Sequence, residues 1–556
     1  MADPERPEPI VRPIDKEEIA MTQTAARKQG YTATVVAGCF AVLLAQVAYS
    51  LPGALNGTFQ QEFQTTGAEL AWITAAFAIP MVVFELTTGA IGDLFGRRRL
   101  LQVGALLTVA GSLVSCVAET VQILWIGQVV AGLGAAILYP ISLAMLAAVS
   151  PSQEARTKAI AVWAGFLSIG AAISPLMGGW LAAEGNWRTS YIVVIAAAVV
   201  SIIITRFAAD SSAPEGRKLD IPGQVTLALG LIAILFAATQ GSEAGFARPE
   251  IIGAFVAGLV LLGAFVVIES RADVPLLHLN IFANRSYAIV AIATVVGMFA
   301  FLAICYSMSI WLGAIQHQSA LKIGVLFLFI QGPAFVLMTA VSHLIRNFSP
   351  RWVLTVGFAL IAVSGVWCST FDVHDMNWTR FIGPMLALGV GFALTVGSIT
   401  AVAINAVPLR LAGMASATTN LLRDFGFALG PVLIAAFAVS GANSDLNTGF
   451  GRAIGESGLE PPYTDIAGGI AHGGGAMAIN SMPVVPGAGP DMPSVPMPES
   501  LRALALESLG NAYSLAFLVA ALCAAAAAAL TLFGLFGSKR ADVEEPLSDE
   551  ELVPAE

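Results

Sequence analysis

Long uninterrupted apolar blocks constrain this chain more than any other feature of its sequence. A helix needs about 20 predominantly apolar residues to cross the roughly 30 Å hydrocarbon core of a membrane. Of the 556 residues, 57% are hydrophobic and only 12% are charged, whereas soluble domains carry about 25% charged residues. Fourteen blocks bounded by charge, glycine or proline predict spanning helices, at residues 31–51, 70–91, 100–118, 122–148, 158–183, 188–208, 222–240, 251–268, 286–313, 321–343, 352–370, 380–406, 412–440 and 511–537.

The positive charges test this count, because Lys and Arg gather on the cytoplasmic side of membrane proteins. With a cytoplasmic N-terminus and alternating helices, 20 of the 27 Lys and Arg residues fall in cytoplasmic segments and 6 in external segments, and Arg423 alone lies inside a span. Both tails are then cytoplasmic, which requires an even number of helices. We therefore expect an integral protein of the bacterial cytoplasmic (inner) membrane.

The segments outside the spans carry few chemical motifs. The polar first 30 residues lack the apolar core of a cleavable signal peptide. Residues 441–500 are rich in Gly, Pro and Met and predict a flexible external loop, in which His472 and the methionines lack the repeated spacing of a metal site. No Gly-Lys dipeptide occurs, which excludes a P-loop ATPase, and the net charge of −10 suggests no nucleic-acid partner. We expect neither a metal nor a cofactor.

A repeat in the glycines divides the chain in two. The Gly-x-Gly pair that begins at Gly132 recurs at Gly389, an offset of 257, and the Gly-x3-small-Pro stretch at Gly170 recurs at Gly426, an offset of 256. Small residues let helices approach closely in lipid, and parallel halves are a known transporter plan. The predicted organisation is an N-terminal tail at 1–30, a six-helix half at 31–208, a linker with an inserted helix pair at 209–268, a second six-helix half at 285–537 and an acidic tail at 538–556.

The loop between the second and third predicted spans carries the strongest resemblance to a known family. It reads Gly89-Ala90-Ile91-Gly92-Asp93-Leu94-Phe95-Gly96-Arg97-Arg98-Arg99. It resembles the signature loop of the major facilitator superfamily, G-x-L-x-D-R-x-G-R-[KR], except that Leu94 replaces the usual basic residue. The resemblance implies an all-helical major facilitator fold, in which this loop latches the two halves together in the outward-facing state. The implied latch residues are Gly89, Gly92, Asp93, Gly96, Arg97 and Arg98.

The fifth span reads Gly170-x3-Ser174-Pro175-x2-Gly178-Gly179. It is similar to the family's exporter motif, G-x3-G-P-x2-G-G. The run from Asn420 to Gly430 resembles the fourteen-span drug:proton antiporter branch of the family. That resemblance implies export of a small organic compound by proton antiport and alternating access, with the proton gradient as energy source. The implied partners are the lipid bilayer, the small-molecule substrate and, in a Gram-negative cell, a periplasmic adaptor with an outer-membrane channel.

The chain departs from that branch where protons are usually carried. The first span has no acid, and the fourth span has Gln128 where the branch has an arginine. The ionisable groups left inside the spans are Glu85, Arg423 and Asp424, and charges within a membrane are costly enough to indicate function. We hypothesise that Glu85 pairs between the halves with Arg423, or with Asp424 beside it, and carries a proton when the pair breaks. A static structural pair is the alternative.

Polar and aromatic residues inside the spans are the candidates for a central substrate cavity, although each could instead pack against neighbouring helices. They are Trp72, Phe77, Gln128, Trp163, Phe166, Tyr306, Gln331, Asn405 and Asn420. Two other functions stay open: an importer or lipid flippase of the same fold, and a membrane-embedded sensor or enzyme. The chain has no zinc motif and no Gly-x-Ser-x-Gly motif, which weighs against an enzyme.

Overall fold

The computed structural model describes residues 16–212, 220–272, 279–407, 412–487 and 493–535, which are nearly all helical. Helices are expected here because a backbone inside lipid must satisfy its hydrogen bonds within the segment. The first half of the chain forms α1 (Lys16–Ser50), α2 (Pro52–Phe63), α3 (Gly67–Phe95), α4 (Arg97–Cys116), α5 (Val121–Val149), α6 (Gln153–Ala183) and α7 (Arg188–Thr205).

Two helices and a short 3₁₀ turn follow, namely α8 (Ile221–Ala244), α9 (Pro249–Glu269) and η1 (Leu279–Ala283). The second half forms α10 (Arg285–Ser309), η2 (Ile310–Ile315), α11 (Ala320–Asn347), α12 (Pro350–Ser369), η3 (Trp378–Phe381), α13 (Ile382–Asn405), α14 (Ala412–Glu456), α15 (Tyr463–Ser481), β1 (Val484–Val485), β2 (Val495–Pro496) and α16 (Glu499–Gly534). The strands pair as one small antiparallel hairpin.

Thirteen helices of the described chain are long and apolar enough to cross a membrane. The predicted span at 321–343 corresponds to α11 (Ala320–Asn347), which enters the comparison only with Ala320–Ala334 of its described residues. The all-helical membrane fold is therefore confirmed, whereas the count of fourteen is not. The first predicted block, 31–51, corresponds to the last part of α1, which ends at Ser50, and Pro52 then begins α2.

The two halves pack in the same way, as the glycine repeat predicts. A Cβ on Gly132 of α5 would lie 2.2 Å from the Phe77 carbonyl oxygen of α3, and a Cβ on Gly389 of α13 would lie 2.2 Å from the Ile330 carbonyl oxygen of α11. Only glycine permits so close an approach of two backbones. The repeated glycines therefore occupy equivalent helix crossings.

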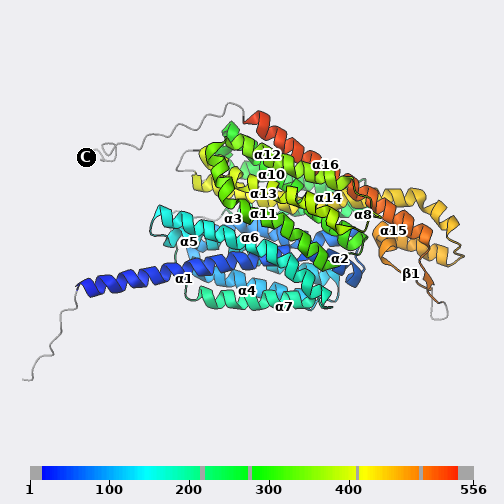
Figure 1. The fold of residues 1–556 in the computed structure, drawn as a ribbon, viewed down its shortest axis with the longest axis horizontal. Coiled ribbons are helices and arrows are strands. Elements are labelled where there is room, and N and C mark those ends of the chain that lie inside the picture. Colours follow the sequence, from blue (N-terminus) through cyan, green and yellow to red (C-terminus); the bar gives the residue numbers. More distant parts are fainter. Residues whose placement is uncertain (1–15, 213–219, 273–278, 408–411, 488–492, 536–556) are drawn as a thin grey trace, which may run out of the picture.

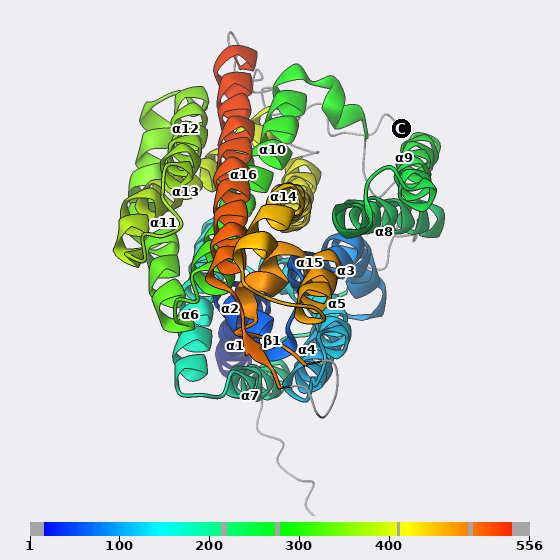
Figure 2. The same ribbon diagram turned by 90° about the vertical axis from the view of Figure 1, so that its right-hand side faces the viewer.

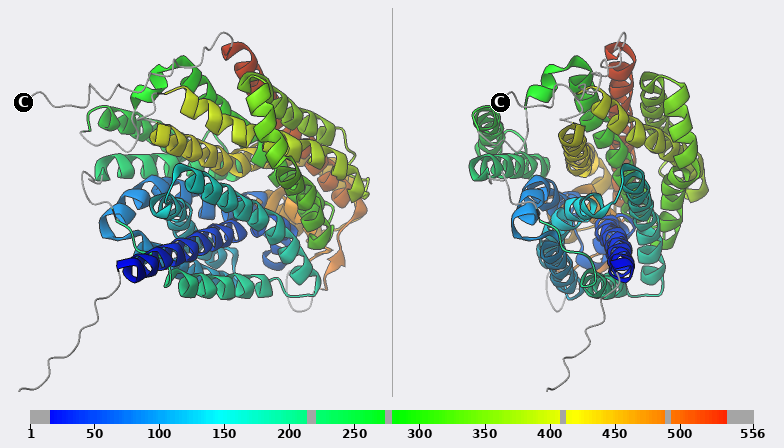
Figure 3. Two further views of the ribbon diagram at one scale, coloured as in Figure 1. Left: turned by 60° about the vertical axis from the view of Figure 1, so that its left-hand side comes forward. Right: turned by 90° about the vertical axis from the view of Figure 1, so that its left-hand side faces the viewer.

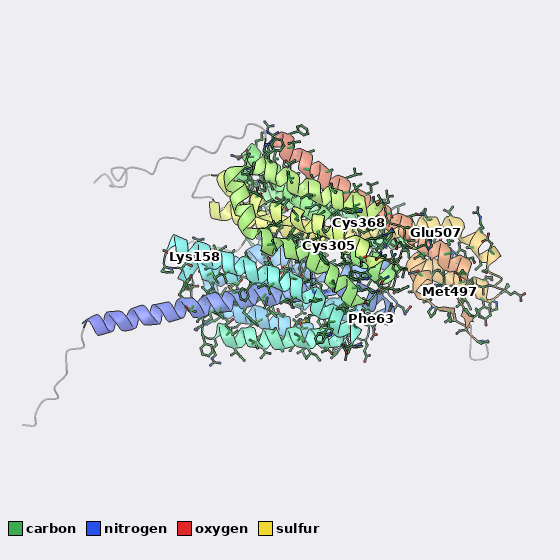
Figure 4. The ribbon with its side chains drawn as sticks, viewed as in Figure 1. Phe63, Lys158, Cys305, Cys368, Met497 and Glu507 are labelled. Atoms are coloured by element: carbon green, nitrogen blue, oxygen red, sulfur yellow. The ribbon has the colours of Figure 1, made fainter. Side chains whose placement is uncertain are left out.

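The two halves lie one above the other in Figure 1, blue to cyan below and green to red above. They meet along two equivalent seams, where α6 packs against α11 and α3 packs against α14. Figure 4 labels Lys158 at one end of the bundle and Phe63 and Met497 toward the other. We call these the Lys158 end and the α15 end.

The inserted helices α8 and α9 pack against each other, and α8 also contacts α3 and α14. They stand beside the rest of the bundle in Figure 2. The Gln224 side chain of α8 donates to the Val83 carbonyl and accepts from the Thr87 hydroxyl, both on α3. The inserted pair therefore covers the outer side of the α3–α14 seam.

The predicted flexible loop at 441–500 is wrong for the residues that the structure describes. α14 continues to Glu456, and α15, the β-hairpin and the first turns of α16 follow. Alanines and other apolar residues among the glycines are buried, including Ala467, Ala471 and Met477. These buried contacts stabilise a folded element, which we call the α15 subdomain (residues 441–487 and 493–500), at the right-hand end of Figure 1.

Candidate functional site

The two seams are closed at the α15 end. A Cβ on Gly179 of α6 would lie 2.3 Å from the Ala320 carbonyl oxygen of α11, and a Cβ on Gly324 would lie 2.6 Å from the Pro175 carbonyl oxygen. On the other seam, a Cβ on Gly67 of α3 would lie 2.3 Å from Val439 of α14. The two halves touch backbone to backbone along α6–α11 and through the Val439 side chain along α3–α14, so both seams are in close contact at this end.

The same helices separate toward the Lys158 end. A Cβ on Gly89 of α3 or on Gly165 of α6 would meet no atom within 4 Å. Gly165 precedes Gly179 by 14 residues, or about four helical turns, so both face roughly the same side of α6. Among the described residues, the halves are therefore in close contact at the α15 end and diverge toward the Lys158 end, as can be followed in Figure 3.

The basic run of the signature loop binds the first residues of the linker that follows α7. Arg97 donates its backbone N–H to the Ser211 carbonyl at 3.0 Å, and the Arg98 guanidinium lies 3.9 Å from the Asp210 carboxylate. Gly92 packs on Ile141 of α5, while the Asp93 side chain lies outside the described residues. A Cβ on Gly96, which has a φ of +96°, would approach Asp210 within 3.4 Å. The described residues of the loop thus contact the N-terminal half and the start of the linker.

The exporter motif forms the inner face of α6. Gly170 packs on the Leu43 backbone of α1, and the Ser174 hydroxyl donates to the Val47 carbonyl at 2.6 Å. Gly178 packs on Leu51, and Gly179 with Pro175 forms the contact with α11 described above. One stretch of α6 therefore touches both α1 of its own half and α11 of the other half.

The ionisable groups inside the membrane meet at the α3–α14 seam. The Arg423 guanidinium makes a forked ion pair with Asp424, at 2.8 Å from Nε to Oδ1 and 3.0 Å from Nη2 to Oδ2. It also donates to the Asn420 amide oxygen at 3.4 Å. Glu85 of α3 lies beside Asp424, within range of its carboxyl group and of the Arg423 charge. Glu85 therefore meets the other half through Asp424, the second partner of the hypothesis, while Asp424 itself holds the Arg423 guanidinium. That this group carries a proton stays a prediction.

Two tyrosines from the N-terminal half surround this cluster. Tyr49 of α1 and Tyr139 of α5 both lie within electrostatic range of Asp424 and Arg423. The Tyr139 hydroxyl donates to the Gln46 amide oxygen at 2.7 Å, and the Gln46 amide nitrogen donates to the Ser50 hydroxyl at 2.8 Å. The sequence alone did not single out either tyrosine as part of the site. Their presence inside spans, in a chain with eight tyrosines, was the available signal.

The residues proposed for a central cavity lie at separate places in the structure. Gln128 is buried inside the N-terminal half, where its amide donates to the Ser115 and Tyr191 hydroxyls, both at 3.2 Å. Trp72 packs on Trp125 of α5, and Phe77 packs on Tyr49 with ring centroids 5.5 Å apart. Asn420 alone among the candidates is directly bonded to the charged cluster.

The remaining candidates lie on several helices. Trp163 donates to the Ser142 hydroxyl at 2.9 Å and packs, like Phe166, on Cys39 of α1. Tyr306 is buried in the C-terminal half near Tyr513. Gln331 lies seven residues, about two turns, beyond Gly324 and so shares its seam-facing side of α11, and the Asn405 side chain lies outside the described residues.

One open apolar groove of about 440 Å³ lies elsewhere, between α8, α9, α14 and α16, with Phe246, Leu433 and Leu515 in its lining. It contains none of the cavity candidates. Among the described residues, no group of three or more His, Cys, Asp or Glu side chains could hold a metal ion.

Two repeated helical halves, in contact with each other at one end and carrying buried charges at their seam, are the architecture of a membrane transporter. The family model of the Major Facilitator Superfamily matches residues 38–431, and the chain belongs to that superfamily. It is accordingly an integral membrane secondary transporter and not an enzyme.

Several relatives share most of their length with this chain. The multidrug resistance protein Stp of Mycobacterium tuberculosis is 27% identical over 397 residues, which cover 71% of this chain and 73% of that protein. The tetracenomycin C resistance and export protein of Streptomyces glaucescens is 24% identical, covering 73% and 76%. Multidrug resistance protein 3 of Bacillus subtilis is 23% identical, covering 78% and 85%.

The solved structures show the same fold at low identity. The crystal structure of tetrameric PepTSo2 matches with a TM-score of 0.56 and 16% identity, covering 90% of this chain and 97% of that chain. A POT family transporter in complex with 5-aminolevulinic acid matches with a TM-score of 0.56 and 11% identity, covering 73% and 93%.

Proposed function

We propose that this transporter exports a small organic, drug-like or amphipathic compound from the cytoplasm of a bacterium by proton antiport. The names of its relatives, which include two multidrug resistance proteins and an antibiotic export protein, support export of such a compound. The exporter motif on α6 agrees with this direction. The 20-to-6 distribution of Lys and Arg supports a cytoplasmic Lys158 end and cytoplasmic termini in the inner membrane.

In this orientation the described structure is the inward-open state. The cytoplasmic mouth receives the substrate, and the closed α15 end blocks the way out. The contacts of the signature loop among the described residues lie within the N-terminal half and the start of the linker, which agrees with a latch that engages after the halves rock. Export requires the α6–α11 and α3–α14 seams to open at the α15 end and to close at the cytoplasmic end.

The proton site that we propose consists of Glu85, Arg423 and Asp424. The observation that supports it is the contact of α3 with α14, which brings Glu85 beside Asp424. Two carboxyl groups share one guanidinium, so a single positive charge neutralises only one of them. An unpaired charge away from water is costly, whereas a protonated carboxyl group is not. With Arg423 engaged by Asp424, Glu85 holds the proton. When rocking separates α3 from α14, Glu85 loses its neighbours and exchanges its proton with the water of the open side.

The test is transport in proteoliposomes with and without a pH gradient. Glu85→Gln should lower the pH-gradient-driven accumulation of substrate at least about tenfold (about 1.4 kcal/mol). One-for-one exchange of substrate across the membrane should continue. Glu184→Gln is the matched control, because Glu184 is an exposed carboxylate at the end of α6. Unchanged gradient-driven transport in Glu85→Gln would remove Glu85 from the proton path.

The same vesicles separate the alternatives. Substrate movement in the direction of the proton flow would show an importer, and movement of fluorescent phospholipid between leaflets would show a flippase. Efflux profiling of a deletion strain against a panel of compounds would identify the substrate class.

A further inference from the structure

The α15 subdomain touches the place where the two halves close at the α15 end. There, α2 of the N-terminal half meets the end of α10 and η2 of the C-terminal half. The Asn56 amide of α2 donates to the Ser309 hydroxyl at 3.1 Å, and that hydroxyl donates to the Gly53 carbonyl at 2.5 Å. A Cβ on Gly57 would lie 2.5 Å from the Gly313 carbonyl oxygen. We call this contact of α2 with Ser309–Ile315 the α15-end gate.

The C-terminal side of this gate is an unusual turn. Residues Ile310–Ile315 form a π-helix that continues α10, and all six are buried. The Gln316 backbone N–H closes the turn on the Trp311 carbonyl at 2.9 Å. Single π-turns within α-helices are uncommon and often occur at functional positions. Because a π-turn accommodates one more residue than an α-turn, it widens the helix at Gly313, the residue that touches α2.

The last carbonyls of this turn are bound by the α15 subdomain. The Asn480 amide nitrogen, near the end of α15, donates to the Ile315 carbonyl at 3.1 Å and to the Ala314 carbonyl at 3.3 Å. Asn480 is only 7% exposed, so water competes little for these two acceptors. The last carbonyls of a helix have no partner within it, and Asn480 supplies that partner to both.

Asn480 is itself held in place. Gly475 has a φ of +64°, which bends α15 in the left-handed region that suits glycine. The following backbone N–H, of Ala476, donates to the Asn443 side chain of α14 at 3.1 Å. The last turns of α15 are therefore fixed to the long α14 helix and present Asn480 to the π-turn.

We propose that Asn480 is a positioning residue for the α15-end gate: it stabilises the π-turn that brings Gly313 against α2, and so sets how often this end of the transporter opens. Rocking to the opposite state must separate α2 from η2 and break the Asn56–Ser309 hydrogen bond. The two Asn480 hydrogen bonds oppose any relaxation of the turn that withdraws Gly313. The α15 subdomain thereby controls the gate without lining the transport path.

The proposal is tested by the distance across the closed end. Spin labels at Gln122→Cys and Met376→Cys, in a background with the five cysteines replaced by alanine, report on the two halves of the full chain in lipid nanodiscs. Gln122 starts α5 and is exposed, and Met376 is 53% exposed in the loop before η3. Asn480→Ala should raise the ratio of long to short distances about tenfold, because two neutral hydrogen bonds are lost. Asn480→Asp should do the same, since its carboxylate faces two carbonyl oxygens.

The controls separate gating from folding. Asn447→Ala, an exposed asparagine of the same subdomain on α14, should leave the distances unchanged. Ser309→Ala weakens the gate from its other side and should shift the distances in the same direction as Asn480→Ala. This second variant tests the gate even if Asn480→Ala folds poorly. A wild-type distance distribution in both Asn480 variants would overturn the proposal. The readout needs no substrate and no proton gradient, so it stands apart from any failure of the proposed export.

Discussion

The α6–α11 seam allows a prediction in which one methyl group redistributes the two states of the transporter. In Gly179→Ala the new Cβ would lie 2.3 Å from the Ala320 carbonyl oxygen and 2.7 Å from its carbonyl carbon. Both are backbone atoms of another helix, so neither can rotate away, and the halves must separate by about 1 Å to reach ordinary contact distances. Overpacking of this kind costs about 1–3 kcal/mol.

That cost applies only while the α15 end is closed. At about 1.4 kcal/mol for each tenfold change, the open-to-closed ratio at this end should rise by roughly 5-fold to 150-fold. The assay is the spin-label distance between Gln122→Cys and Met376→Cys, together with a second pair, Arg156→Cys and Ser349→Cys, at the Lys158 end. The first distance should lengthen and the second should shorten.

Gly165→Ala is the matched control on the same side of α6. Its Cβ would meet no atom within 4 Å in the described state, and alanine favours the helix by about 1 kcal/mol over glycine. It should leave the closed α15 end intact and hinder only the closure of the Lys158 end. If Gly179→Ala leaves both distance distributions as in the wild type, the seam is not a gate and the reasoning from glycine contacts fails.

Three further predictions concern polar groups. Gln128→Leu should destabilise the protein by about 1–3 kcal/mol in thermal unfolding, because it leaves two buried hydroxyls without their partner. Transport titrations should show an unchanged KM for the substrate. Arg423→Met should cost about 3–5 kcal/mol by stranding a buried carboxylate, and Asp424→Asn added to it should restore folded yield. Lowering the pH at the α15 end from about 7.5 to about 5 should open that end, because burial, together with the nearby Arg502 charge, lowers the pKa of His317 in the closed state.

The sign of the pH effect follows from linkage. The closed end holds the neutral His317 ring, which lies 3.4 Å from the Gln61 amide nitrogen and 3.4 Å from the Asn480 carbonyl oxygen. An open end removes the remaining contacts of this partly exposed ring and returns its pKa to the ordinary value of about 6.5, so protonation favours opening as the pH falls through that value. His317→Gln should remove the pH dependence of the Gln122–Met376 distance. An unaltered dependence in that variant would assign the effect to another group.

Much of the architecture could be predicted from the sequence because it depends on local chemistry. Apolar block length indicates a helix that spans lipid, and the glycine repeat indicates equivalent crossings, which Gly132 and Gly389 confirm by packing on equivalent carbonyls. The α15 subdomain could not be predicted in this way. Its glycines suggested a flexible loop, whereas its order depends on contacts such as Asn480 with η2, which join residues far apart in the chain.

The charged cluster shows the same division. The sequence by itself determined that Glu85, Arg423 and Asp424 lie in membrane-spanning segments. They are recognisable as candidates because so few charged residues are found in such segments. Only the tertiary structure decided their partners. Asp424 forms the forked ion pair with Arg423, and Glu85 lies beside Asp424. Tyr49 and Tyr139 approach from α1 and α5. The physical reason is that helix periodicity and burial cost can be read from one segment, whereas the pairing of side chains depends on how two separate halves dock.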